Sequence, residues 1–184
     1  RLYVANSGGY SATFDSTLSV VDLNTMAETQ KYKVGVNPGV ITADNSGNIY
    51  VACGGNYDDV APSLVKFSTA TNTVVKAADT AIGKIRYYDG LLYATGGYYG
   101  SKNVRTLSTT DFKETRSNFV TDGTAIVNPY GVNIDPETGD VYVTDAKNFL
   151  STGHVFCFDK TGKKKLDFSV APAVGPNTVV LIRQ

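Results

Sequence analysis

The sequence predicts an all-β fold, a β-propeller made of four-stranded antiparallel blades, and three observations carry that prediction. A short strand motif centred on a tyrosine recurs four times in the 184 residues. The chain contains 18 glycines and 12 tyrosines but no tryptophan, a composition typical of a protein rich in strands and turns. The stretches between the motifs lack helical periodicity, which argues against a helical repeat protein.

The repeated motif is an apolar strand, found at residues 2–5, 49–52, 92–95 and 141–144. Its tyrosines stand at positions 3, 50, 93 and 142, so the repeat is 43 to 49 residues long, the length of a propeller blade. We expect these tyrosines to pack between neighbouring blades rather than to contact a ligand.

Each repeat reads as four strands joined by hairpins. A first strand ends in a turn rich in Asp, Asn, Pro and Gly, at residues 44–48, 89–90 and 135–140, and the tyrosine strand follows. A third strand (18–22, 64–67, 155–159) and a more polar fourth strand complete the unit. The chain is therefore predicted to be a single propeller domain or fragment of about four blades. Its repeats lie at approximately 1–36, 37–83, 84–127 and 128–174, with a closing strand at 175–184.

The two ends of the chain suggest how the ring closes. The chain starts at a tyrosine strand, whereas residues 174–182 have the pattern of a first strand after a loop resembling 35–38. This last strand could complete the blade that begins at Leu2, which gives a four-bladed ring, or a blade that precedes Arg1. Four-bladed rings are uncommon, so we favour the second alternative, the C-terminal part of a larger propeller.

The residues after the tyrosines carry a family resemblance. Tyr142-Val143-Thr144-Asp145 differs by one residue from Tyr-Val-Thr-Asn, the tetrapeptide that names the YVTN, or surface-layer-type, propeller repeats. Residues 128–146 resemble the last blade of a group of Bacteroidota cell-surface lipoproteins, the corrinoid-capturing, BtuG-like group, and residues 54–64 resemble that group's long loop. The resemblance implies a seven-bladed ring, of which this chain would supply about the last four blades. It also implies a location on the extracellular face of the outer membrane, and capture of a corrinoid such as cobalamin for an outer-membrane transporter.

Charge and hydropathy exclude several classes of partner. Lys and Arg together number 17, as do Asp and Glu, so no net charge favours nucleic acid or an anionic membrane. No stretch approaches the roughly 18 apolar residues of a membrane helix, and the first residues already read as a strand, so we expect no secretion signal within this chain. Cys53 and Cys157 lie in different repeats and are expected to be two separate buried thiols.

One face of the propeller is predicted to hold the ligand. The loops between second and third strands are long and rich in glycine and aromatic residues, at 6–14, 54–62, 96–100 and 145–149, and the inter-blade loops on the same face contain 37–38, Lys84, 128–130 and 176–177. Tyrosine offers a rigid face with a polar tip, and glycine allows close backbone approach. The expected ligand-binding residues are Tyr10, Asn37, Tyr57, Tyr98, Tyr99, Asn128, Tyr130, Asn148 and Phe149; the alternative is that these aromatic residues only cap the blades.

The pattern predicts no catalytic residue, no metal site and no cofactor. His154 is the single histidine and is expected to be an ordinary strand-edge residue. Asp58 and Asp59 lack the spacing of a calcium loop, and the lysines at 163–165 lie on the opposite face. Acidic residues on the loop face, such as Asp145, leave open the alternative of paired catalytic carboxylates like those of propeller glycosidases.

The leading functional hypothesis is a non-catalytic cell-surface protein that captures a ligand on this loop face. A protein-interaction or structural surface-layer module using the same face is the first alternative. A propeller enzyme of the lactonase or lyase type is the second.

Overall fold

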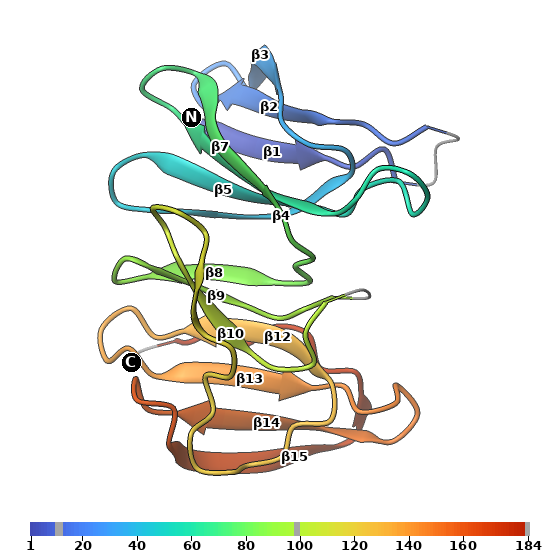
Figure 1. Cartoon of the computed structure of the whole chain (residues 1–184), viewed down its shortest axis with the longest axis vertical. Coiled ribbons are helices and arrows are strands. Elements are labelled where there is room, and N and C mark those ends of the chain that lie inside the picture. Colours follow the sequence, from blue (N-terminus) through green and yellow to red (C-terminus); the bar gives the residue numbers. More distant parts are fainter. Residues whose placement is uncertain (10–12, 98–99, 183–184) are drawn as a thin grey trace. The chain divides into compact units, whose positions relative to one another are not determined.

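The computed structural model describes residues 1–9, 13–97 and 100–182, and the described residues contain strands, turns and loops but no helix. No described element is a helix with the length and apolarity needed to cross a bilayer. The strands form four antiparallel sheets in two compact units, Arg1–Ile82 and Gly83–Gln184 (Figure 1). The expectation of an all-β fold of about four propeller-type blades is confirmed.

The first unit holds a three-stranded and a four-stranded sheet, each with its strands in chain order. The first sheet consists of β1 (Leu2–Asn6), β2 (Thr17–Asp22) and β3 (Ala27–Lys33), and the second of β4 (Pro38–Ala43), β5 (Asn48–Cys53), β6 (Ser63–Ser68) and β7 (Thr73–Asp79). The apolar sequence of β5 is buried, whereas the polar sequence of β3 is exposed. Leu18, Val51 and Phe67 belong to the core between these sheets, and Tyr3 packs against it.

The second unit holds two four-stranded sheets. The third sheet consists of β8 (Ile85–Tyr88), β9 (Leu91–Ala94), β10 (Arg105–Ser108) and β11 (Glu114–Arg116), and the fourth of β12 (Pro129–Ile134), β13 (Val141–Asp145), β14 (Thr152–Phe158) and β15 (Lys164–Val174). Their shared core contains Val104, Phe119, Val141 and Phe158. Every adjacent pair of strands is antiparallel.

The repeated tyrosines serve the packing of the sheets. Tyr50 is fully buried, and its hydroxyl donates a hydrogen bond to the Asp44 carboxylate at 2.9 Å, which ties the strand to the preceding turn. Tyr93 packs edge-on against Phe119, with ring centroids 5.4 Å apart, inside the core of the second unit. These contacts explain why the motif recurs once per sheet.

The expected closing strand at 175–184 does not form in its described part, residues 175–182. A strand requires a ladder of backbone hydrogen bonds to a neighbour. This segment instead approaches β12 through other contacts: the Val179 amide donates to the Asn133 side chain at 3.2 Å, and the Asn177 carbonyl lies against Gly131. Residues 175–182 thus find no partner edge among the described residues, and pairing of the closing strand with a preceding blade stays a prediction.

The two cysteines are free and buried, in agreement with the prediction of separate thiols. Burial raises the pKa of the Cys53 thiol to about 11. Burial also raises the pKa of Cys157, whose sulfur contacts the Tyr142 hydroxyl. Both groups are therefore held as neutral thiols in the fold.

Candidate functional site

A cavity of about 650 Å³ opens among the loops of the second unit, within the size range of small-molecule sites. Its walls come from the segment before β8, the loop after β9, the start of β12 and the loop after β13. The residues that line it are Gly83, Lys84, Thr95, Gly97, Gly100, Ser101, Lys102, Val127, Asn128, Pro129, Tyr130, Lys147 and Phe149. The cavity thus lies on the predicted loop face.

A buried carboxylate, that of Asp145 at the end of β13, fixes two of these walls. Its side chain is only 2% exposed and accepts three backbone hydrogen bonds. One oxygen accepts from the amides of Asn128 at 2.8 Å and Lys147 at 2.9 Å, and the other accepts from Val127 at 3.1 Å. All three donors belong to residues that line the cavity. Hydrogen bonds to a charged group are stronger than neutral ones, so Asp145 clamps the two loops together.

Asn128 reinforces the clamp. Its side-chain amide donates to the Lys147 carbonyl at 3.2 Å, and its own carbonyl accepts from the Ala146 amide at 3.1 Å. The two loops are therefore joined by both backbone and side-chain bonds. Asn128, a predicted ligand-binding residue, therefore lines the cavity and also holds its two loops together.

The loop after β13 adopts a conformation that side-chain-bearing residues rarely take. Lys147 and Phe149 have positive φ values of 50° and 61°. The turn closes through a bond from the Phe149 amide to the Ala146 carbonyl at 2.9 Å, and the Asn148 side chain accepts from the amides of Leu150 and Ser151. Strained backbone of this kind is held by its surroundings and concentrates at functional sites.

Two aromatic rings form a corner of the cavity. Tyr130 and Phe149 lie nearly perpendicular, at 88°, with centroids 5.1 Å apart. The Lys84 ammonium lies over the face of Tyr130, 5.9 Å from its centroid. An edge-to-face aromatic pair with a cation on one ring is a rigid wall that presents both apolar surface and positive charge.

The predicted residues of the first unit lie at the corresponding loops of the second sheet. Asn37 and Tyr57 are brought together, with the Asn37 side-chain nitrogen 3.4 Å from the Tyr57 hydroxyl. The Tyr57 ring also meets Phe14 edge-on at 5.6 Å and is 60% exposed. Both Asn37 and Tyr57 have positive φ values, 57° and 63°. These contacts order an exposed aromatic loop.

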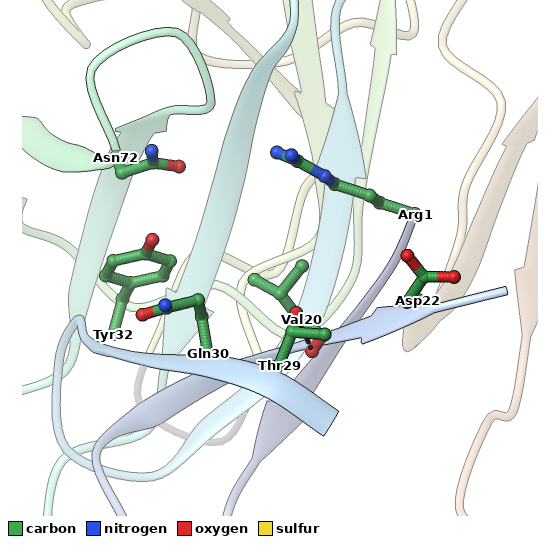
Figure 2. A pocket seen from close by; sticks show the side chains of 7 residues that line it. All are labelled: Arg1, Val20, Asp22, Thr29, Gln30, Tyr32 and Asn72. Atoms are coloured by element: carbon green, nitrogen blue, oxygen red, sulfur yellow. Dashed lines mark hydrogen bonds between the residues drawn. The ribbon is translucent and has the colours of Figure 1, made fainter. Parts of the chain in front are cut away.

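A second hollow, of about 320 Å³, lies in the first unit at the opposite ends of the strands. Figure 2 shows its lining residues, including Arg1, Asp22, Thr29 and Asn72. Two of its polar side chains serve local structure, since Asp22 accepts from the amides of Asn24 and Thr25, and Thr29 donates to the Val20 carbonyl; the hollow is also about half the volume of the larger cavity. We therefore place the candidate site in the larger cavity.

The predicted site residues divide into three groups. Asn128, Tyr130 and Phe149 line the cavity, whereas Asn148 caps the adjoining turn. Asn37 and Tyr57 meet in the first unit. Tyr10, Tyr98 and Tyr99 lie outside the described residues. Ligand contact by any of them stays a prediction.

The sequence placed Lys84 and Lys147 in loops of the predicted face but indicated no ligand contact for them or for Lys102, and it did not predict the clamp formed by Asp145. Lys84 and Lys147 occur in loops assigned to the correct face, so a search for basic residues in loops of equivalent position could have found them. Lys102 follows the glycine-rich loop of the third repeat. The role of Asp145 depends on backbone amides from two loops, and no sequence pattern reports that geometry.

The acidic and histidine side chains of the described residues form no metal-ligating cluster of three or more. His154 lies on β14, where its ring nitrogen is 2.8 Å from the Asp167 carboxylate of β15. The Asp167 pKa is lowered, first by its bond to Lys164 and then by that to His154. This pair links β14 to the outermost strand β15, and neither residue lines the cavity.

Neither a protein-family model nor a curated protein matches the chain. Three solved structures resemble it in fold. Hydrazine synthase of Kuenenia stuttgartiensis is 15% identical, with a TM-score of 0.66 over 84% of this chain and 43% of that one. A quinoprotein alcohol dehydrogenase-like protein of Bacteroides thetaiotaomicron is 11% identical, with a TM-score of 0.68 over 91% and 45%. The protein U3-55K is 7% identical, with a TM-score of 0.58 over 84% and 43%.

The chain spans less than half the length of these three structures. At such identities the likeness concerns the fold alone, a β-propeller type of which this chain forms about four blades.

Proposed function

We propose that the chain is part of a non-catalytic binding propeller that captures a small molecule in the loop-face cavity of the second unit. The observation that carries this proposal is the cavity of about 650 Å³ with an aromatic corner, whose loops are held in place by Asp145. Loops fixed in advance lower the entropic cost of binding, because they need no ordering when the ligand arrives.

The first ligand to test is a corrinoid such as cobalamin. The resemblance of residues 128–146 to cell-surface corrinoid-capturing lipoproteins supports this choice, as it supports a location at the cell surface and delivery to an outer-membrane transporter. The loop face offers the exposed aromatic side chains that a large, partly polar ligand requires.

The test is calorimetric titration of the purified protein with cobalamin, with two tyrosine variants as a matched pair. Tyr130→Ala removes one ring of the cavity corner and is expected to weaken binding by about tenfold, the effect of losing one aromatic contact. Tyr57→Ala removes an exposed ring that does not line the cavity, so this proposal, in contrast to the sequence-based expectation of ligand contact at Tyr57, predicts unchanged affinity. No heat at tens of micromolar would remove the corrinoid assignment, and equal effects of the two variants would move the site away from the cavity.

A protein partner at the same loops is the second candidate, favoured by one residue. Leu150, at the end of the loop after β13, is 85% exposed. A large apolar side chain at a loop tip is typical of a contact surface. If an outer-membrane partner is retained by the protein but lost by Leu150→Ser, while cobalamin titrations stay blank, this second function replaces the first.

A further inference from the structure

The cavity of the second unit has a marked excess of positive charge. Lys84, Lys102 and Lys147 line it, and no Asp or Glu is among its described lining residues. The chain as a whole is neutral, with 17 basic and 17 acidic side chains. Three lysines in the lining of one cavity therefore represent local segregation of charge, which raises the concentration of anions there.

The acid nearest in the chain to Lys147, Asp145, does not form a salt bridge with it. Asp145 is buried, and its two oxygens accept hydrogen bonds from three backbone amides. None of the three lysines forms a salt bridge with an acid among the described residues. Their charges are left for water or for a ligand.

The aromatic corner formed by Tyr130 and Phe149 is a second feature that the ligand has to match. Tyr130 and Phe149 stand at 88° to each other, so a flat ring can stack on one of them while its edge meets the other. The Lys84 ammonium, 5.9 Å from the Tyr130 centroid, lies at the same wall and can meet an anionic group carried by that ring. The same wall of the cavity thus presents a positive charge and a flat apolar surface.

We propose that this cavity selects a small molecule in which a flat conjugated ring carries carboxylate or phosphate groups. The inference rests on the proposed function and narrows its ligand class. Lysine is a donor without acceptor capacity, so it matches anionic oxygens better than the amide groups that surround the corrin ring of cobalamin.

The test compares ligands that share one flat ring system and differ in whether they carry an anionic group. Flavin mononucleotide and riboflavin share one flat ring system, but only the first carries a phosphate. Naphthalene-2,6-dicarboxylate and its diamide make the same comparison for carboxylates. Fluorescence or calorimetric titration is expected to show at least about tenfold tighter binding of the anionic member of one pair or both, weakening as salt rises. The ligand pair whose anionic member binds more tightly shows whether the cavity prefers phosphate or carboxylate.

Lysine variants locate the effect. Lys84→Gln, Lys102→Gln and Lys147→Gln are each expected to weaken anion binding by about 3- to 10-fold, with little change for the neutral ligand. Lys113→Gln is the matched control, because Lys113 is exposed in the turn between β10 and β11 and pairs with Asp111. Lys102 is exposed, so its variant keeps the test valid if the other two fail to fold.

Equal affinity for charged and neutral members, or equal effects of Lys102→Gln and Lys113→Gln, would overturn the inference. If cobalamin then still bound in a Tyr130-dependent manner, the proposed function would survive without it. If neither anions nor cobalamin bound, both would fall.

Discussion

The second and fourth sheets build the same loop junction with different polar groups. In each, a proline at the start of the first strand pairs with the last residue of the next, Pro38 with Cys53 and Pro129 with Asp145, and a bulge follows the proline. The asparagine before the proline accepts a backbone bond across the junction in both, from Gly54 at 2.8 Å and from Ala146 at 3.1 Å. The backbone framework is therefore common to the two sheets.

The side chains at the paired positions differ in what they hold. Cys53 is a buried neutral thiol, whereas Asp145 is a buried carboxylate that binds three loop amides. The bulge residue is Gly39 in the second sheet and Tyr130 in the fourth, where its ring lines the cavity. The two junctions therefore share a backbone framework and differ at two positions, one whose side chain holds the loops together and one whose side chain lines the cavity.

Removing the carboxylate is expected to have the largest effect. Asp145→Ala leaves three backbone amides without their acceptor and should lower the free energy of unfolding by roughly 3 kcal/mol. Urea denaturation measures the change, and hydrogen exchange should accelerate at Val127, Asn128 and Lys147. Asp167→Ala, at an exposed ion pair, is the control and should cost about 1 kcal/mol or less. Equal losses in the two variants would contradict the clamp.

Two glycines of the first strands give the next prediction. A Cβ on Gly131 would collide with the Asn177 carbonyl, whereas a Cβ on Gly39 meets nothing within 4 Å. Gly131→Ala is therefore expected to destabilise by about 2 kcal/mol through overpacking, and Gly39→Ala by less than about 0.5 kcal/mol. Thermal or urea unfolding distinguishes them. A tolerated Gly131→Ala would mean that residues 175–182 do not pack on β12 in solution.

The buried Cys53 thiol of the second sheet predicts that the free energy of unfolding depends on pH. Burial raises the Cys53 pKa to about 11, so the folded state disfavours the thiolate. The stability from this group is full below the unfolded pKa of about 8.5 and is lost as pH rises toward 11. Cys53→Ala should therefore flatten the fall of stability with pH in that window. In the native protein Cys53 should resist a thiol reagent at pH 8, and rapid native labelling would contradict its burial.

The smallest effect is expected at the first unit's exposed loop. Tyr57 is 60% exposed, and its contacts include the Phe14 ring and the Asn37 side chain. Tyr57→Ala should change the free energy of unfolding by less than about 1 kcal/mol. A loss comparable to that of Asp145→Ala, measured in the same denaturation series, would show that this loop is held as firmly as that of the fourth sheet.

Much of the fold followed from local signals. The tyrosine motif and the Asp, Asn and Gly turns are set by residues close in sequence, and they predicted a propeller of about four blades. The closing strand at 175–184 stays a prediction, because its described residues 175–182 pair with no strand edge. The seven-bladed ring stays a prediction.

Of the residues that line the cavity, the sequence predicted a ligand-binding role for only three. The periodicity placed Asn128, Tyr130 and Phe149 on one face, and the structure gathers them around one cavity. The gathering of Lys84, Lys102 and Lys147 around one cavity was not predicted, because these lysines are far apart in sequence and the overall neutrality of the chain hides local charge. The clamp depends on three amide directions at Asp145, which only folded geometry supplies.

Hydrogen–deuterium exchange with and without ligand tests the central claim most directly. With saturating cobalamin or flavin mononucleotide, whichever binds more tightly, peptides covering 127–130 and 145–150 of the cavity should gain protection. The loop 54–62 at the second sheet serves as the internal reference and should not change. Protection confined to 54–62, or no protection in either segment, would contradict the assignment of binding to the junction that Asp145 holds.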